Sequence, residues 1–207
     1  MLYDLIVWSG PLITPPMGSK SSKNCEEESC QDPANLTFVT WNIDGLDKKD
    51  LEDRTIAVVE EIERVEADIV FLQEVVWNTF MMIQTRLSPK YECIAAKRDF
   101  YFVATLLKKE NIRLKHYDVV DFKTSLMERH VLCVQVSCGK NDLELMNTHL
   151  ESLAEHADER RRQLATCTQM ISKIPDTRTV ILAGDMNMED TWLGEAEMGN
   201  IPESIEV

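Results

Sequence analysis

Short apolar runs, each bounded by polar or turn residues, follow one another along the chain from residue 36 to residue 185. Runs of this length that are rich in β-branched and aromatic side chains are typical of buried strands. The pattern predicts strands at residues 36–41, 68–75, 91–96, 102–107, 114–120, 131–137, 143–150 and 179–185. Gly139, Lys140 and Asn141 separate two of these runs and predict a hairpin turn.

Three segments have the spacing of amphipathic helices instead. The first spans residues 47–66, begins at Asp47 as its N-cap and places four apolar residues on one face: Ile56, Val59, Ile62 and Val65. The second spans residues 77–87, and the third, which is basic, spans residues 156–174 and ends before Pro175. Strands that alternate first with helices and then with hairpins favour the α/β (α+β) class, as a two-sheet β-sandwich flanked by helices.

The N-terminal part of the chain has a different composition. Residues 9–35 combine Gly, Pro, Ser and Glu, which is a linker composition without residues for a core. We therefore expect a flexible segment over residues 1–35 and a single domain over residues 36–207. The first eight residues are apolar but contain Asp4 and no basic region, which is a poor signal peptide. No run approaches the ~18 apolar residues that cross a membrane.

Charge and cysteine content narrow the classes of function and the cellular compartments that the chain suits. The chain has 22 Lys and Arg against 36 Asp and Glu, a net charge of −14. This argues against a surface coated with basic groups for nonspecific nucleic-acid binding, but it allows an enzyme that binds phosphate through a metal. Residues 185–207 hold seven acids and no base, which suits metal ligands or a solvated acidic tail. The six cysteines form no CxxC pair, which favours an intracellular, reducing compartment.

Polar residues stand at the ends of several predicted strands, where such sheets place their chemistry. Asn42 follows the first strand, and by itself it is typical of a turn before Gly45. Glu74 follows four apolar residues, and a buried carboxylate needs a partner. That partner is either an arginine, Arg54 or Arg64, or a divalent cation. Mg²⁺ prefers oxygen ligands from one or two carboxylates, waters and phosphate.

Two further segments carry candidate chemistry. A lone histidine in an apolar run is more often a satisfied core residue, but His149 stands in the polar sequence NTHLES, which favours a cleft. Asp185 and Asn187 in AGDMN lie two residues apart, on the same side of an extended segment. An aspartate held by a neighbouring amide can act as a general base or orient a water. By itself GDxN is a weak signal, because Gly-Asp turns are common.

The motifs WNIDG, LQEV, NTHLES and GDMN occur in this order, each after a predicted strand. In this order the chain resembles the endonuclease/exonuclease/phosphatase superfamily of Mg²⁺-dependent phosphoesterases. The wording TWNIDGLD, FLQEV, THLES and GDMN is most similar to its branch of type-two 5′-tyrosyl-DNA phosphodiesterases. The similarity covers about residues 36–187 and includes YFVATLLKK and RHVLCVQV. It implies a DNase I-like fold.

The resemblance also implies roles for the strand-end residues. Asn42 and Glu74 would lie at a Mg²⁺ site that also accepts Mn²⁺, with Glu74 as the direct ligand. His149 would donate a hydrogen bond to a nonbridging phosphate oxygen and stabilise the charge that grows there. Asp185 would orient or deprotonate the attacking water, with Asn187 beside it.

The substrate side follows from the same resemblance. Ser152 would contact the phosphate, and Tyr101 and Arg129 would line the DNA groove. The implied substrate is a DNA 5′ end joined to a topoisomerase tyrosine, and hydrolysis would leave a 5′ phosphate. DNA repair of this kind implies a nuclear enzyme, with the cytoplasm as a second location.

The chain departs from the family pattern in ways that lower the expected activity. Family members end with a Ser-Asp-His motif whose histidine contacts the phosphate, and no histidine follows His156 here. Ala154 and Glu189 stand where relatives carry basic groove residues. The N-terminal ubiquitin-associated domain of vertebrate relatives is also missing. We therefore expect a C-terminally incomplete domain without its closing strands.

Three hypotheses stay open. The first is a Mg²⁺-dependent 5′-tyrosyl-DNA phosphodiesterase. The second is a related nuclease or phosphatase that acts on abasic DNA, RNA tails or a phosphoinositide. The third is a catalytically weak or inactive truncated isoform or fragment, which would act by binding DNA or partners.

Overall fold

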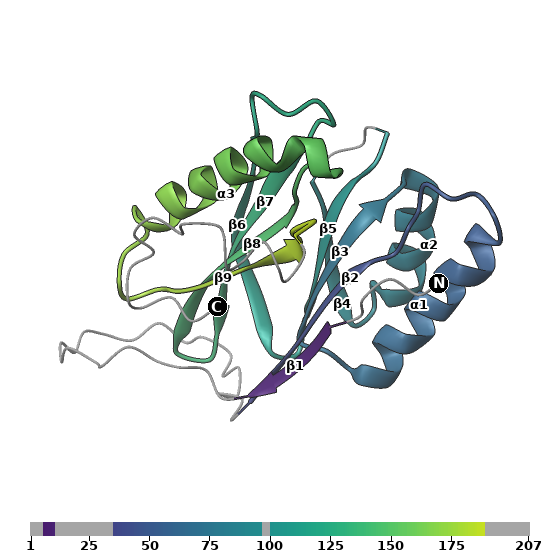
Figure 1. Ribbon diagram of the computed structural model, residues 1–207. Helices are drawn as coiled ribbons and strands as arrows, with labels where there is room; N and C mark the ends of the chain where they lie inside the picture. Colours follow the sequence, from purple (N-terminus) through teal and green to yellow (C-terminus); the bar gives the residue numbers. More distant parts are fainter. Residues whose placement is uncertain (1–5, 11–34, 97–99, 189–207) are drawn as a thin grey trace.

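The computed structural model describes residues 6–10, 35–96 and 100–188, and these residues form a sandwich of two mixed β-sheets with helices outside (Figure 1). The first sheet has the strand order β1-β2-β3-β5-β4. Its strands are β1 (Ile6–Gly10), β2 (Leu36–Asn42), β3 (Ile69–Val75), β4 (Tyr91–Ala95) and β5 (Phe102–Lys108). The second sheet has the order β6-β7-β8-β9. Its strands are β6 (Ile112–Asp121), β7 (His130–Cys138), β8 (Asn141–His149) and β9 (Thr179–Asp185).

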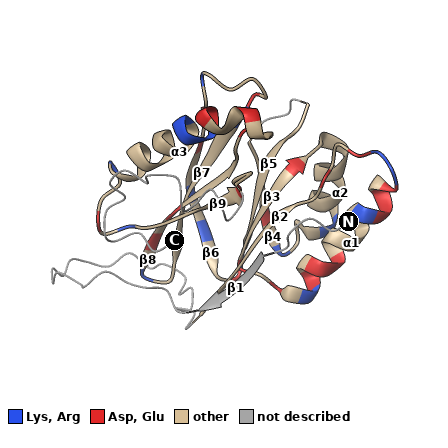
Figure 2. Cartoon of the chain, in the orientation of Figure 1, with Lys and Arg blue, Asp and Glu red and all other residues tan. Residues whose placement is uncertain are grey.

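Three apolar clusters define four layers. Helices α1 (Leu51–Val65) and α2 (Trp77–Leu87) pack on the outer face of the first sheet, around Ile62, Leu72 and Phe80. The facing sides of the two sheets form the second cluster, around Phe71 and Leu145. Helix α3 (Ala157–Ile171), preceded by the short 3₁₀ helix at Ala154–His156, packs on the second sheet through Cys167. Figure 2 shows charged residues on α1 and α3, while the strands are mostly uncharged.

The predicted two-sheet sandwich is confirmed, and each predicted strand is present within a few residues of its expected bounds. The sequence did not predict β1, which pairs antiparallel with β2 inside the segment expected to be flexible. Backbone hydrogen bonds to β2 stabilise this strand. Residues 1–5, 11–34 and 189–207 lie outside the described residues. In the part of the chain that is described, no helix is long and apolar enough to cross a membrane.

Helix α1 corrects two predictions. Asp47 is not its N-cap, because the Asp47 carboxylate accepts the N–H of Lys49 at 2.9 Å and closes a local turn. The helix therefore begins at Leu51. Val59 and Ile62 are buried as predicted and Val65 packs against the same cluster, but Ile56 is 45% exposed and Thr55 is buried instead. The hydroxyl of Thr55 donates to the carbonyl of Leu51 at 2.6 Å, so its burial leaves no unpaired donor. Helix α3 likewise ends at Ile171, three residues before the predicted end.

Two parallel strand pairs position the candidate site. In the first sheet β2 runs parallel to β3, and Asn42 pairs with Gln73 at their carboxyl ends. In the second sheet β8 runs parallel to β9, and His149 pairs with Asp185 at theirs. Strand β2 contacts β9 and β3 contacts β8 across the sandwich. The carboxyl ends of all four strands therefore meet at one edge of the molecule.

A polar bridge crosses the otherwise apolar space between the sheets. The amide nitrogen of buried Gln73 donates to the side-chain oxygen of buried Asn147 at 2.9 Å. Asn147 in turn donates to the carbonyl of Ala104 at 2.8 Å. Because buried amides are costly without partners, this bridge favours a single alignment of the two sheets just below the strand ends.

Candidate active site

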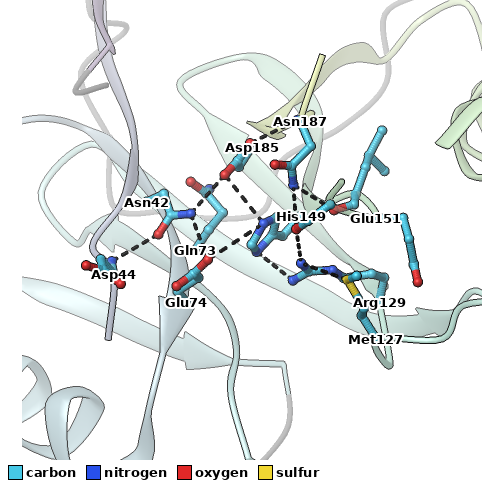
Figure 3. A network of polar contacts seen from close by, with 12 residues as sticks. Asn42, Asp44, Gln73, Glu74, Met127, Arg129, His149, Glu151, Asp185 and Asn187 are labelled. Carbon is cyan, nitrogen blue, oxygen red and sulfur yellow. Dashed lines mark hydrogen bonds and ion pairs between the residues drawn. The ribbon is translucent and has the colours of Figure 1, made fainter. Parts of the chain in front are cut away.

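Four side chains from the meeting strand ends form one connected polar cluster (Figure 3). The side-chain nitrogen of Asn42 donates to Glu74 Oε1 at 3.2 Å and to Asp185 Oδ2 at 2.8 Å. His149 Nε2 lies 3.4 Å from Asp185 Oδ2 and 4.0 Å from Glu74 Oε1. Residues that are 143 positions apart in sequence are thus in direct contact.

A β-bulge places Glu74 in this cluster. The pairing of β3 with β5 shifts register between Leu72 and Val75, and Glu74 has a φ of 55°, in the left-handed region. A glutamate rarely adopts this backbone conformation, and such strain persists where the surroundings enforce it. Here Gly45 enforces it: its N–H donates to the carbonyl of Glu74 at 3.0 Å. A Cβ atom at Gly45 would lie 2.2 Å from that carbonyl oxygen, so only glycine allows this approach.

Asn42 organises the two carboxylates through its amide nitrogen. Its side-chain oxygen accepts the backbone N–H of Asp44 at 3.0 Å, which orients the amide nitrogen toward Glu74 and Asp185. In this arrangement the oxygen is engaged away from the carboxylates. The role of Asn42 as a metal ligand therefore stays a prediction, and its positioning of the carboxylates is the contact that the structure shows.

The surroundings of Glu74 decide between the two partners that the sequence left open. Arg54 bonds backbone carbonyls of the loop before α1 and lies 3.5 Å from Asp44, while Arg64 pairs with Glu61. Neither arginine reaches Glu74. Burial raises the pKa of Glu74, and the negative charges of Asp44 and Asp185 raise it further, against the hydrogen bond from Asn42. A cation would relieve this concentration of negative charge.

The donor set fits Mg²⁺ bound by few protein ligands. Within the described ranges, no three or more His, Cys, Asp and Glu side chains gather into a group that could hold a metal alone. Mg²⁺ does not require one, because it typically keeps several waters and binds one or two carboxylates together with substrate phosphate. The Glu74 carboxylate, with Asp185 close by, offers oxygen ligands of this kind.

Arg129 sets the protonation state of His149. An Arg129 guanidinium nitrogen lies 2.7 Å from His149 Nδ1, and a guanidinium can only donate. Nδ1 must therefore accept, and the proton of the neutral ring resides on Nε2, which faces Asp185. Burial and the Arg129 charge lower the pKa of His149 to about 3. At neutral pH the ring is thus an uncharged donor aimed at the cluster.

The remaining predicted residues adjoin His149 on its other side. Arg129 donates to Ser152 Oγ at 2.8 Å, and its guanidinium carbon lies 5.2 Å from the centre of the Tyr101 ring. Asn187 donates from its backbone to Asp185 at 2.9 Å and from its side chain to Ser152 at 3.3 Å. Tyr101, Arg129 and His149 also line a small pocket, together with Phe102, Glu128 and His130.

The structure thus brings all eight predicted residues into one contiguous site, and it adds residues that sequence reasoning missed. Ala154, the substituted groove position, lies in the short helix before α3, and Glu189 lies outside the described residues. The missed residues are Gly45 and Glu151. Gly45 was visible in the sequence only as a turn glycine, and Glu151 only as one of the polar neighbours of His149 in NTHLES.

Comparisons with known proteins agree with this geometry. Residues 39–199 match the endonuclease/exonuclease/phosphatase family. Tyrosyl-DNA phosphodiesterase 2 of Mus musculus is 38% identical over 175 residues, which are 84% of this chain and 46% of the mouse protein. The Homo sapiens protein of the same name is 36% identical over 189 residues, 90% of this chain and 51% of that protein. The chain therefore spans about half the length of the curated relatives it matches.

Solved structures give the same result. The crystal structure of Danio rerio TDP2 in complex with a single-strand DNA product matches with a TM-score of 0.74 at 32% identity. The match covers 77% of this chain and 64% of that one. A humanised Danio rerio TDP2 with 14 mutations matches with a TM-score of 0.76 at 32% identity, over 81% of this chain and 68% of that one. The described sandwich is therefore the fold of these structures.

Proposed function

The chain belongs to the endonuclease/exonuclease/phosphatase family, and from this premise we propose that it serves as a DNA-repair phosphodiesterase that hydrolyses 5′-phosphotyrosyl bonds. The observation that carries the proposal is the contact of Glu74, Asp185 and the Nε2–H of His149 at the joined strand ends. Identity of 30–38% to eight tyrosyl-DNA phosphodiesterase 2 proteins supports this substrate over other members of the family.

The reaction that we propose replaces the tyrosine of a trapped topoisomerase by water. A water oxygen forms a bond to the 5′ phosphorus, the bond from phosphorus to the tyrosine oxygen breaks, and that oxygen leaves with a proton. The products are a 5′-phosphorylated DNA end and a tyrosyl peptide. In this proposal Asp185 accepts a proton from the water, a role supported by the amide groups of Asn42 and Asn187, which donate to its two carboxylate oxygens.

His149 and its neighbours hold the phosphate in this proposal. The Nε2–H of His149 donates to a nonbridging oxygen, whose negative charge grows in the transition state. Mg²⁺, held at Glu74 when bound, would supply positive charge for the phosphate and for the departing tyrosine oxygen. In this proposal the partly exposed Tyr101 ring, with the buried Arg129 guanidinium 5.2 Å from its centre, offers an aromatic contact to a single DNA strand. With such a substrate, we propose the nucleus as the place of action.

An oligonucleotide with a 5′-phosphotyrosine tests the proposal. We expect this chain to release tyrosine in the presence of Mg²⁺ and to stop when EDTA is added. Glu74→Gln should abolish release, whereas Glu66→Gln, a change at an exposed acid in the loop after α1, should leave it unchanged. Abasic DNA, RNA and a phosphoinositide serve as competing substrates. Oligonucleotide binding without release of tyrosine would instead support a DNA-binding role, and faster cleavage of a competing substrate would change the assignment.

A further inference from the structure

The loop between β6 and β7, residues 122–129, carries Arg129 to His149. Phe122 packs in an apolar cluster at its start and bonds Arg129 at its end, but apolar packing does not explain the shape of its middle. Leu126, in the middle of the loop, is 78% exposed. Glu128, next to Arg129, has a φ of 55°, which a residue other than glycine rarely adopts. A conformation of this kind persists only where surrounding groups enforce it.

A buried carboxylate on another element provides that restraint. Glu151 follows β8 and has 0% relative exposure. Its Oε1 accepts the backbone N–H of Leu126 at 2.8 Å. Its Oε2 accepts the hydroxyl of Ser125 at 2.7 Å and the side-chain amide of Gln163 at 2.9 Å. Burial raises the pKa of Glu151, but these hydrogen bonds outweigh burial and lower it overall, so the group is ionised at neutral pH.

Ser125 connects this carboxylate to Arg129. While its hydroxyl donates to Glu151, its oxygen accepts the backbone N–H of Arg129 at 2.9 Å and that of Met127 at 3.2 Å. Arg129 then donates to His149 Nδ1 at 2.7 Å (Figure 3). A further hydrogen bond joins the loop to α3, because the Thr124 hydroxyl donates to Glu159 at 2.7 Å. An unbroken series of hydrogen bonds therefore runs from Glu151 through Ser125 and Arg129 to His149.

We propose that Glu151 is a positioning residue, which fixes loop 122–129 so that Arg129 holds His149 in the tautomer with its proton on Nε2. The charge and shape of a carboxylate are both required. Glu151 accepts three hydrogen bonds at once, whereas a glutamine has one acceptor oxygen and an amide that donates. The amide nitrogen of a glutamine at this position would face at least one of the three donors, which belong to Leu126, Ser125 and Gln163. At least one of the three present hydrogen bonds would therefore be lost.

The first test is the tautomer of His149, read from the ¹⁵N resonances of its ring in the metal-free chain and assigned with a His149→Gln variant. Wild type should show Nε2 protonated and Nδ1 unprotonated. Glu151→Gln should show both tautomers in exchange. Glu144→Gln is the matched control, because Glu144 is a buried acid on β8 itself, is 6% exposed and accepts a hydrogen bond from Arg178 at 2.8 Å, five residues before His149. It should keep the wild-type tautomer.

Ser125→Ala breaks the same series of hydrogen bonds one step closer to Arg129. Ser125 is half-buried, so its replacement should destabilise the fold less than replacement of the fully buried Glu151. It should shift the tautomer in the same direction as Glu151→Gln, and it decides the question if Glu151→Gln does not fold. A wild-type ring spectrum in a folded Glu151→Gln variant, or in Ser125→Ala, overturns the proposal.

The kinetic consequence rests on the proposed function. Replacing a residue that orients a functional group through hydrogen bonds typically lowers activity by about 10–100-fold. We expect Glu151→Gln to lower kcat by that factor with a smaller change in KM, and Glu144→Gln to lower neither. If wild type releases no tyrosine, the proposed function fails, but the tautomer comparison still tests the role of Glu151.

Discussion

Replacing Gly45 by alanine should displace the carboxylate of Glu74, the proposed metal ligand, without any change to a charged group. The added Cβ would lie 2.2 Å from the carbonyl oxygen of Glu74, and contacts under 3.0 Å are essentially never tolerated. The contact must therefore open by about 0.8 Å, the difference between these two distances. The oxygen belongs to backbone, and the carbon of the same carbonyl and the nitrogen of Val76 also lie 3.4 Å from the Cβ position. The bulge that carries Glu74 has to shift.

Two effects of different size follow from this shift. Overpacking of this kind typically costs about 1–3 kcal/mol of unfolding free energy. For a domain of this size each kcal/mol lowers Tm by roughly 2–4 °C. The larger effect is on function, because a displacement of about 1 Å at a reacting group can cost ~10²-fold in rate. We expect Gly45→Ala to bind Mg²⁺ more weakly and to lose about 10–100-fold in tyrosine release.

Calorimetric Mg²⁺ titration, thermal unfolding and tyrosine release measure these effects on the same preparation. Gly139→Ala is the matched control, since Gly139 has a φ of 56° in the turn between β7 and β8. It should cost about 1 kcal/mol of stability through backbone strain and leave Mg²⁺ affinity unchanged. If Gly45→Ala loses stability but binds Mg²⁺ and releases tyrosine as wild type does, then Gly45 does not hold Glu74 in its working position.

Three further predictions test the metal, the thiols and the polar bridge. Mg²⁺ at ~100 times its Kd should add about 2.7 kcal/mol to the unfolding free energy, and thermal unfolding of Glu74→Gln should show little of this gain. Burial raises the pKa of Cys133 and of Cys167 from near 9 to about 12, so the folded chain keeps protons that the unfolded chain loses. Stability should therefore fall as pH rises from about 9 to 12, less steeply in a Cys133→Ala, Cys167→Ala double variant, as urea unfolding would show. Asn147→Ala should leave the buried amide of Gln73 with one partner fewer and cost about 1–3 kcal/mol, and an unchanged urea midpoint would contradict this account of the bridge.

The strands and the ordered motifs were predictable because both are local. A buried strand needs several consecutive apolar residues, and such runs are visible in the sequence at β3 and β5. The pattern of apolar residues was insufficient to predict an element whose bounds are set by particular hydrogen bonds. Asp47 bonds its own turn and not the helix. Strand β1 begins with the apolar residues Ile6, Val7 and Trp8, but its place in the sheet depends on its pairing with β2. A hydrogen bond within the turn decided the first case and pairing with a distant segment decided the second, and the spacing of apolar residues reveals neither.

The sequence by itself determined which polar residues stand at the strand ends. Apolar runs that are visible in the sequence end shortly before Asn42, Glu74, His149 and Asp185. Only the tertiary structure decided how these groups act. The left-handed backbone of Glu74 depends on Gly45, and the tautomer of His149 depends on an arginine 20 residues away in sequence. The buried carboxylate of Glu151 holds that arginine's loop from a third segment. Hydrogen-bond direction and charge depend on distances of a few ångströms between segments, and these distances exist only once the two sheets have packed.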